Sequence, residues 1–395
     1  MISVAEARAI VLGHAQTLPP ETAPLLETFG RTLRERIVAE RPQPPFAASA
    51  MDGYALRSAD TPGALRCVGE AGAGRALERP LAAGECARIF TGAPLPPGAD
   101  AILIQEDAKR NGDTVTAPRV ETGKHVRREG VDFAAGATLL EPGCVLNGPA
   151  IALAAAAGRD RLSVSKQPRI AVLSGGDELV PPGVTPKPDQ IFDSVSYGIA
   201  GLAQTWGALA RCSAPLSDNE KLIARRVNDA LAEADLAVVI GGASVGDHDH
   251  ARPALMRAGA DLLFEKVALR PGKPTWLARR DRQLILGLPG NPASAFVCAR
   301  LFLKPLLDRL LGRDPALSAQ AHAVRLRGAL AANGGRETYL RAHVAADRTG
   351  QLWAEPAPNQ DSSLISVFAA ANALLVRALD SRAAVEGELV DVLYI

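Results

Sequence analysis

The stretch from Gln283 to Arg300 reads QLILGLPGNPASAFVCAR. Its first six residues form a short, mostly apolar run, which is typical of a strand covered on both faces. Pro289 and Gly290 interrupt that run, and Asn291 followed by Pro292 suits the first turn of a helix, with the Asn291 side chain as its cap. The sequence therefore predicts a buried strand, a tight loop and a helix that begins near Asn291.

The start of this helix is a candidate anion site. The first backbone N–H groups of a helix have no partner within it, and the positive end of the helix dipole lies behind them. Ser294 lies in the first turn, where its hydroxyl would add another donor. These groups suit phosphate or another oxyanion. The same residues also fit an ordinary capped helix in an α/β domain, so both interpretations stay open at this point.

Composition narrows the class of protein. The chain has 395 residues, with 44 basic and 43 acidic side chains and a net charge of +1, which argues against a broad nucleic-acid surface. The five cysteines are scattered without a CxxC pair, which argues against disulfides and a zinc cage and favours a reducing compartment. No apolar run approaches the length of a membrane span, and Glu6 and Arg8 do not fit a signal peptide. We expect a soluble cytoplasmic protein that binds neither nucleic acid nor membrane.

A chain of this length has room for several domains. Apolar spacing predicts helices over residues 3–16, 25–36 and 143–158, whereas residues 46–141 show short apolar runs between glycines and prolines, typical of a β-rich unit. The expected domains are a helical N-terminal linker domain (1–45 plus 142–167), a β-rich insert domain (46–141), an α/β domain (168–317) and a small C-terminal β-barrel-like domain (318–395).

The α/β domain is predicted from three apolar runs that alternate with helical segments. RIAVLS (169–174), LAVVIGGAS (236–244) and QLILGL (283–288) read as strands, and residues 194–211 and 251–259 read as helices. This alternation favours a doubly wound, mostly parallel sheet.

Glycines and polar residues follow each of the three strands. Ligands of such sheets bind beyond the carboxyl ends of the strands, so three polar loops at one edge indicate a binding site. The residues at these three strand ends are Ser174, Gly175, Gly176, Asp177 and Glu178 for the first, Gly241, Gly242, Ala243 and Ser244 for the second, and Gly287 to Asn291, including Pro289 and Gly290, for the third.

Carboxylates near these loops suggest a metal. Asp177 and Glu178 lie in the first loop, Asp193 and Asp218 lie farther along, and Asp247-His248-Asp249-His250 follows the second. Oxygen ligands beside an anion loop suit Mg²⁺ bridging phosphates. These side chains also fit helix caps and solvated turns, and the histidines lack the spaced partners that zinc requires.

A basic turn completes the candidate site. Arg270-Pro271-Gly272-Lys273-Pro274 presents two cations, and Lys266 precedes it. Cations beside an oxyanion loop would offset its ligand's charge, although an ordinary basic surface turn has the same composition. In the insert, Met51-Asp52-Gly53-Tyr54 and Thr91-Gly92-Ala93-Pro94 read by themselves as turns.

Taken together, these segments resemble the molybdopterin molybdenumtransferase (molybdenum insertase) family, which includes the catalytic domain of gephyrin. The resemblance is collinear over essentially the whole chain. It rests on PPFAASAMDGYA, GECARIFTGAPLPPGADAILIQED, VRREGVDFAAG, VLSGGDELV, DQIFDSVSYG, PLSDNE, GGASVGDHD, RPGKPT, GLPGNPAS and QDSSLIS.

The resemblance implies an L-shaped homodimer that inserts molybdate into adenylylated molybdopterin with Mg²⁺ and releases AMP. A molybdopterin adenylyltransferase and maturation factors of molybdoenzymes would be its partners. The residues implied as catalytic are Asp52, Thr91, Glu178, Asp218, Asp249, Lys266, Arg270 and Lys273, with Glu178, Asp218 and Asp249 as metal ligands. Those implied in substrate binding are Ser174, Gly175, Gly176, Gly242, Ser244, Gly272, Pro289, Gly290, Asn291, Pro292, Ser294, Arg341 and Ser366.

The chain departs from the family pattern at several positions. Ala47-Ala48 replaces the usual Asp-Asn, Val195 replaces a common Asn, Arg270 a common Lys and Asp361 a common Gly. These departures leave open a specialised paralogue that acts as a molybdopterin-binding or cofactor-binding scaffold. The α/β domain alone would also suit a molybdopterin adenylyltransferase.

Overall fold

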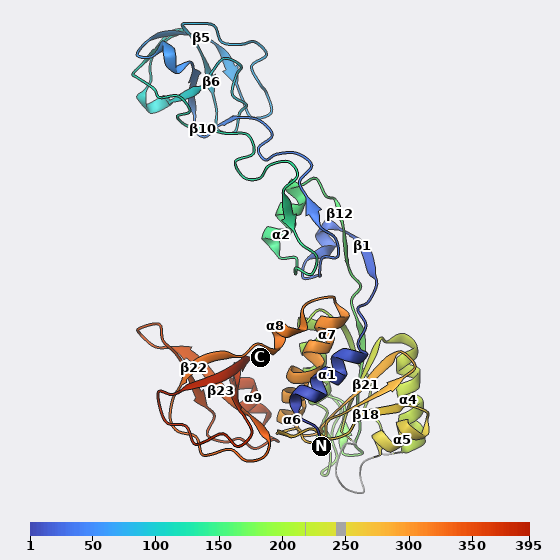
Figure 1. Cartoon of the computed structure of the whole chain (residues 1–395). Helices are drawn as coiled ribbons and strands as arrows, with labels where there is room; N and C mark the ends of the chain where they lie inside the picture. Colours follow the sequence, from blue (N-terminus) through green and yellow to red (C-terminus); the bar gives the residue numbers. More distant parts are fainter. Residues whose placement is uncertain (218, 242–249) are drawn as a thin grey trace.

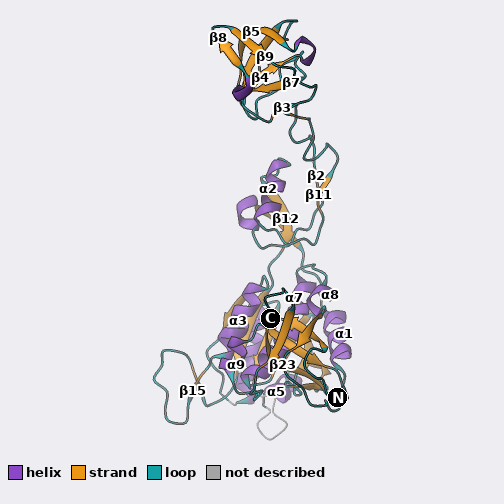
Figure 2. Cartoon of the chain, turned by 90° about the vertical axis from the view of Figure 1, so that its left-hand side faces the viewer, coloured by secondary structure: helices purple, strands orange, loops and turns teal. Residues whose placement is uncertain are grey.

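The computed structural model describes residues 1–217, 219–241 and 250–395. Figure 1 shows an elongated chain, with the insert at one end and the α/β sheet together with the C-terminal barrel at the other. A narrow linker lies between them, and both chain termini lie at the α/β end (Figures 1 and 2). No helix in the described part of the chain is long and apolar enough to cross a membrane.

The α/β domain contains the predicted sheet. Its strand order is β16-β13-β17-β21-β20-β18, in which the first four strands pair in parallel and β20 pairs antiparallel with both β21 and β18. The bounds are β16 (Leu209–Cys212), β13 (Arg169–Ser174), β17 (Leu236–Ile240), β21 (Gln283–Leu288), β20 (Trp276–Arg280) and β18 (Asp261–Phe264). The doubly wound, mostly parallel sheet is confirmed.

Helices cover both faces of this sheet, because its central strands are apolar on both sides. One apolar cluster joins the sheet to α1 (Val4–His14), α3 (Val195–Thr205), α6 (Pro292–Cys298) and α7 (Lys304–Leu310). The cluster on the opposite face includes residues of α4 (Glu220–Glu233) and α5 (Ala251–Arg257). A π-helical turn over Ala299–Leu303 connects α6 to α7, and α8 (Pro315–Ala319) follows. The short β14 (Leu179–Val180) and β15 (Ile191–Phe192) pair beside the sheet.

One predicted helix of this domain is too long. The helix expected over 194–211 ends at Thr205, and Leu209–Cys212 is the edge strand β16. Gly207 follows the helix with a φ of +102°, a backbone conformation that glycine adopts easily and that ends the helical path. The helix expected over 251–259 is confirmed as α5.

The linker contains the predicted helix α2 (Gly148–Ala156), capped by Asn147. Two antiparallel ribbons accompany it: β1 (Pro20–Pro24) pairs with β12 (Arg161–Ser165), and β2 (Ile37–Val38) pairs with β11 (Thr138–Leu140). The predicted helix over 25–36 is wrong. Only Leu25–Thr28 forms a 3₁₀ turn, after which Thr32 and Leu33 make β-bridges, so tertiary pairing overrides the local helical pattern.

The insert is β-rich, as predicted. Its sheet has the order β7-β4-β6-β5-β9-β8. The bounds are β7 (Ala101–Ile104), β4 (Gly53–Leu56), β6 (Glu85–Ile89), β5 (Gly63–Ala71), β9 (Thr114–Ala117) and β8 (Lys109–Asn111), with a separate ribbon of β3 (Ala48–Ser49) and β10 (Val126–Arg127). Short 3₁₀ turns lie over Ser58–Asp60 and Gln105–Asp107.

The C-terminal strands close into the expected small barrel, because β23 pairs with both β24 and β25. The bounds are β22 (His322–Leu326), β23 (Glu337–Ala346), β24 (Leu352–Pro356), β25 (Ala373–Arg377) and β26 (Leu389–Tyr394), with α9 (Ile365–Ala370) before β25. The two-residue strand β19 (Leu269–Arg270) leaves the α/β domain and pairs in parallel with β23. The barrel is thereby joined to the basic turn that begins at Arg270.

Candidate functional site

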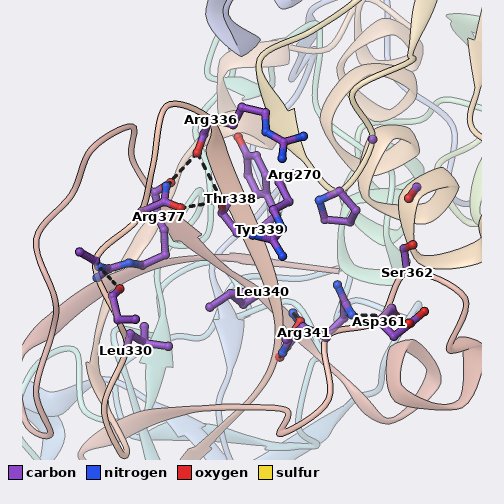
Figure 3. A pocket seen from close by; sticks show the side chains of 17 residues that line it. Arg270, Leu330, Arg336, Thr338, Tyr339, Leu340, Arg341, Asp361, Ser362 and Arg377 are labelled. Atoms are coloured by element: carbon purple, nitrogen blue, oxygen red, sulfur yellow. Dashed lines mark hydrogen bonds between the residues drawn. The ribbon is translucent and has the colours of Figure 1, made fainter. Parts of the chain in front are cut away.

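A pocket of about 580 Å³ lies between the basic turn of the α/β domain and the barrel (Figure 3). Arg270, Pro271, Gly272 and Ser294 line it from the α/β side, and residues of β23 and the loop that ends at Ser362 line it from the barrel side. Among the described lining residues, the charged ones are Arg270, Arg336, Arg341, Asp361 and Arg377. The excess of arginine makes this pocket suited to an anionic ligand.

Arg341 is the most constrained of these arginines, since only 1% of its surface is exposed. Its Nη2 donates a hydrogen bond to the backbone oxygen of Asp361 at 3.0 Å, and its backbone N–H donates to Gln360. Its Nε is buried without a hydrogen-bond partner in the described structure. Burial lowers the pKa of the Arg341 guanidinium, and the nearby Asp361 carboxylate opposes that effect. Arg341 therefore brings a fixed positive charge to the pocket wall, and its Nε is a buried donor left without a partner.

The basic turn is held by close packing beneath it. Gly272 has a φ of +117°, and a Cβ atom on it would overlap the Sγ atom of Cys298. The Thr275 hydroxyl donates to the Gly272 carbonyl at 2.7 Å, which closes the turn. Burial raises the pKa of the Cys298 thiol to about 12, so this cysteine is a neutral packing group rather than a nucleophile. Gly272 is thus required by the turn that places Arg270 at the pocket.

The other predicted cations do not line the pocket. Lys266 accepts a backbone hydrogen bond from Ile2, and Lys273 accepts one from Val267. The structure therefore brings Arg270, Gly272, Ser294 and Arg341 together, while Lys266 and Lys273 lie near the turn outside the pocket lining.

The predicted cap at Asn291 is wrong. Its side chain accepts no hydrogen bond from α6; its Nδ2 instead donates to Ser362 Oγ at 3.1 Å. The backbone N–H of Ala293 donates to the Ser362 carbonyl at 3.0 Å. The loop before the barrel helix α9 therefore occupies part of the helix start that we predicted as an anion site. Pro292 is the first residue of α6, as expected. Ser294 is 5% exposed and lies at the pocket.

The strand-end loops meet at one edge of the sheet, as expected. Gly175 donates its backbone N–H to Ile240 at 2.9 Å, and Gly176 donates to Leu216 at 3.1 Å. A Cβ atom on Gly290 would lie 3.5 Å from Gly241, an ordinary contact distance. Gly290 of the third loop therefore lies near Gly241, the described residue that follows β17, with Pro289 preceding Gly290.

Ser174 has a structural partner at this edge. Its hydroxyl donates to the buried carboxylate of Asp193 at 2.6 Å, and Asp193 also accepts the hydroxyl and the backbone N–H of Ser196. This network fixes the end of β13 against the start of α3. Val195, one of the departures from the family pattern, is buried in the same helix.

Of the predicted metal ligands, only Glu178 lies in the described part of the chain. Its side chain is exposed and folds back over Gly176, where it would overlap a Cβ atom. An exposed carboxylate at the sheet edge fits a ligand of a hard cation. Asp218, Gly242, Ser244 and Asp249 lie outside the described residues, and the residues that are described contain no group of three potential metal ligands.

The insert carries a second polar site around Asp52. The Oδ1 atom of Asp52 accepts hydrogen bonds from the Thr91 backbone N–H and from the Thr91 hydroxyl, both at 2.8 Å. These two bonds lower the pKa of Asp52 below its usual range, and the nearby Arg88 acts in the same direction. Asp52 and Thr91 are thus brought together as a pair.

Arg88 is a member of this site that the sequence did not reveal. Its guanidinium carbon lies 5.2 Å from the Tyr54 ring centre and 4.8 Å from the Phe90 ring centre. It also donates to the Gly53 carbonyl, at 3.1 Å, next to Asp52. The signal was the spacing of Arg88 and Phe90, two residues apart in an extended segment, which puts their side chains on one face.

The site of Asp52 and Thr91 lies at the opposite end of the chain from the pocket and the sheet edge (Figure 1). Ser366 is likewise separate from Arg341: it is exposed on α9 and lines a different hollow of about 370 Å³ beside His343 and Glu355. Arg336 and Arg377 join the pocket without having been predicted, because pairing of Thr338 with Arg377 between β23 and β25 brings distant segments together.

Comparison with known proteins gives the same picture over the whole chain. Residues 2–158 match the family described as MoeA N-terminal region (domain I and II), residues 171–309 match the probable molybdopterin binding domain, and residues 323–395 match the MoeA C-terminal region (domain IV). The chain is 34% identical to the molybdopterin molybdenumtransferase of Nostoc sp., over 81% of this chain and 76% of that protein. It is 35% identical to molybdopterin molybdenumtransferase 2 of Mycobacterium tuberculosis, over 87% of each chain.

A solved structure has the same fold. The molybdopterin biosynthesis protein MoeA from Pyrococcus horikoshii superposes with a TM-score of 0.85 at 28% identity, covering 100% of this chain and 99% of that one. A second structure of the protein from Pyrococcus horikoshii OT3 gives a TM-score of 0.84. The chain therefore belongs to the molybdopterin molybdenumtransferase family.

Proposed function

We propose that this protein inserts molybdate into adenylylated molybdopterin and releases AMP in a reaction that depends on Mg²⁺. The observation that carries the proposal is the arginine-rich pocket between the basic turn and the barrel. The proposal is also supported by relatives that match most of the chain and are named molybdopterin molybdenumtransferase.

The pocket suits a tetrahedral dianion. Arg270 and Arg341 supply charge from two sides, and the Ser294 hydroxyl adds a neutral donor. Charged donors bind an oxyanion more strongly than neutral ones, and a fixed guanidinium loses little side-chain freedom on binding. The cysteine nearest the turn, Cys298, is buried and neutral, so the sulfur ligands of molybdenum would come from the pterin.

Adenylylated molybdopterin would bind at the sheet edge beside this pocket. The loops at Gly175 and Gly290 would approach its phosphates with backbone atoms, as would Gly242 and Ser244. Glu178, Asp218 and Asp249 would hold Mg²⁺, which would supply charge neutralisation at the pyrophosphate. Lys266 and Lys273 would add long-range positive charge from the same side.

We further propose that the functional unit is a homodimer. The insert that carries Asp52 and Thr91 lies far from the sheet edge of its own chain. These two residues could therefore contact only a substrate that is bound at the sheet edge of a partner subunit. A cytoplasmic location agrees with the free cysteines, and a molybdopterin adenylyltransferase would supply the adenylylated substrate.

A scaffold that binds the pterin without turnover is the second candidate. The observation that favours it is Asp361, a lining residue whose negative charge weakens the attraction of the pocket for an oxyanion. Hydrogen bonds from Ser363 lower the pKa of Asp361, with a further contribution from Arg341, so this carboxylate is ionised at neutral pH. The scaffold predicts tight pterin binding without AMP release.

The deciding experiment measures AMP release from adenylylated molybdopterin with molybdate, with tungstate and without either oxyanion. Release that needs Mg²⁺ and an oxyanion supports the insertase, whereas binding without release supports the scaffold. A parallel incubation with ATP and free molybdopterin tests for an adenylyltransferase. Glu178→Gln should fold normally and raise the Mg²⁺ concentration needed for half-maximal release. Glu386→Gln, which changes an exposed carboxylate between β25 and β26 of the C-terminal domain, is the matched control.

A further inference from the structure

Several hydrogen bonds cross the joint between the linker and the α/β domain. The buried apolar residues of the linker, such as Leu33 and Leu162, form one cluster, and those of α7 belong to another. Hydrogen bonds cross the joint instead: Leu18 donates its backbone N–H to the Leu310 carbonyl, and the Ser165 hydroxyl donates to the Leu311 carbonyl. Because hydrogen bonds are directional, such a joint depends on a few well-placed side chains.

Arg313, just beyond the end of α7, makes two side-chain hydrogen bonds across this joint. Its Nε donates to the Thr32 hydroxyl at 2.8 Å, and its Nη2 donates to the Gly30 carbonyl at 3.3 Å, both in the linker. Its Nη1 donates to the Trp206 carbonyl at 2.9 Å, in the α/β domain. One guanidinium thus bridges the two parts of the chain.

This bridge is enclosed and electrostatically supported. The Arg313 side chain is 15% exposed, and Thr32 is fully buried. Asp308, in α7, lies 3.8 Å from Arg313 and is itself held by Lys304 at 2.6 Å. A lysine would retain the charge but would lack the planar fork that reaches three acceptors in fixed directions.

We propose that Arg313 is a positioning residue that fixes the angle between the linker and the α/β domain, and so fixes where Asp52 and Thr91 meet a partner subunit's sheet edge. This inference rests on the proposed homodimeric function. Figure 1 shows the insert beyond the linker, on the side away from the α/β sheet. A small rotation at the joint would therefore produce a larger displacement at Asp52.

If Arg313 acts only by positioning, its replacement should change kcat and leave the KM for molybdate unchanged. The oxyanion pocket is built from residues within one α/β domain and its barrel, so loosening the joint leaves the affinity for molybdate unchanged. The turnover rate falls, because misplacing a reacting group by about 1 Å can cost on the order of a hundredfold. Arg313→Lys should therefore lower kcat by at least about tenfold while the KM for molybdate stays within about twofold of wild type.

The structural test uses small-angle X-ray scattering of the full-length protein. Arg313→Lys should broaden the distribution of interatomic distances, and Thr32→Val, which removes the acceptor on the other side of the joint, should do so as well. The double variant should differ little from Arg313→Lys, because both changes break the same bridge. Arg309→Ala is the control: Arg309 is an exposed arginine in α7, and its replacement should leave scattering unchanged.

Unchanged scattering of Arg313→Lys, with a normal thermal melt, overturns the inference whatever its activity. Additive effects of the two single variants overturn it as well, since they would show independent perturbations. If the wild-type protein releases no AMP, the proposed function fails, yet the scattering comparison still decides whether Arg313 fixes the joint.

Discussion

Trp276 of β20 lies directly opposite Gly287 of β21, and its indole covers the glycine so closely that a Cβ atom there would overlap the ring. Both residues lie in the central sheet, and Trp276 is 1% exposed. Of these two glycines in the strand-loop-helix segment 283–300, Gly287 is required by packing because Trp276 leaves no space for a Cβ atom, whereas Gly290 has that space.

Gly287→Ala should destabilise the fold by about 1–3 kcal/mol, since the new methyl group must displace the Trp276 ring in a packed core. Gly290→Ala is the matched control in the same strand-loop-helix segment and should melt within about 0.5 kcal/mol of wild type. Thermal and urea unfolding of both variants checks the prediction. Equal melting of the two variants would contradict it.

Arg341→Met should abolish tight binding of molybdate while retaining most of the fold's stability. Methionine keeps the volume of the buried chain but removes the guanidinium and its positive charge from the pocket wall. Calorimetric titration with molybdate measures the loss. Arg348→Met removes an exposed arginine of the barrel outside the pocket and should bind like wild type. Undiminished binding by Arg341→Met would place the oxyanion elsewhere.

Thr91→Val should move the acidic limb of the pH–rate profile upward. Hydrogen bonds from Thr91 lower the pKa of Asp52, so the Asp52 carboxylate stays ionised as pH falls through the usual carboxyl range and protonates only below it. Removing the hydroxyl raises that pKa, and any activity that needs the carboxylate is then lost at a higher pH. NMR titration of Asp52 in wild type and variant gives a reading independent of turnover, and coincident titrations would refute the prediction.

Asp361→Gly should bind molybdate more tightly than wild type. Asp361 is a lining residue of the pocket, and the negative charge of its ionised carboxylate opposes the binding of a dianion there. Asp391→Asn, which changes an exposed aspartate of β26 outside the pocket lining, is the control and should bind molybdate like wild type. Weaker binding by Asp361→Gly would show that the carboxylate holds the loop in place rather than opposing the ligand.

Sequence patterns predicted the parts of the fold that depend on local regularity. The apolar runs over 169–174 and 283–288 became buried strands because both of their faces are covered by helices. The run over 209–212 has no such regularity, and it became a strand only because β13 lies beside it. The same reason explains why residues 29–36 are not helical: pairing with distant segments determines their backbone.

The site was predictable where it lies on loops after predicted strands. Ser294 follows the predicted strand over 283–288, and Arg270 lies in a turn marked by its own proline and glycine residues, whereas Arg336 and Arg377 depend on the pairing of β23 with β25 in the barrel. Asn291 shows the opposite error, because a good local capping residue instead bonds Ser362 from a distant segment. Arg313 gave no signal in the sequence, since its three acceptors lie about 100 and 280 residues away.

The pairing of β19 with β23 has a consequence for how fast the pocket fills. Backbone pairing joins Leu269 and Arg270 to the barrel strand that carries Arg341, so we expect the two walls of the pocket to keep their separation when a ligand binds. An entering anion then meets a cavity that needs no closing movement. Its association rate should be set by diffusion and electrostatic attraction, and should fall steeply as ionic strength rises.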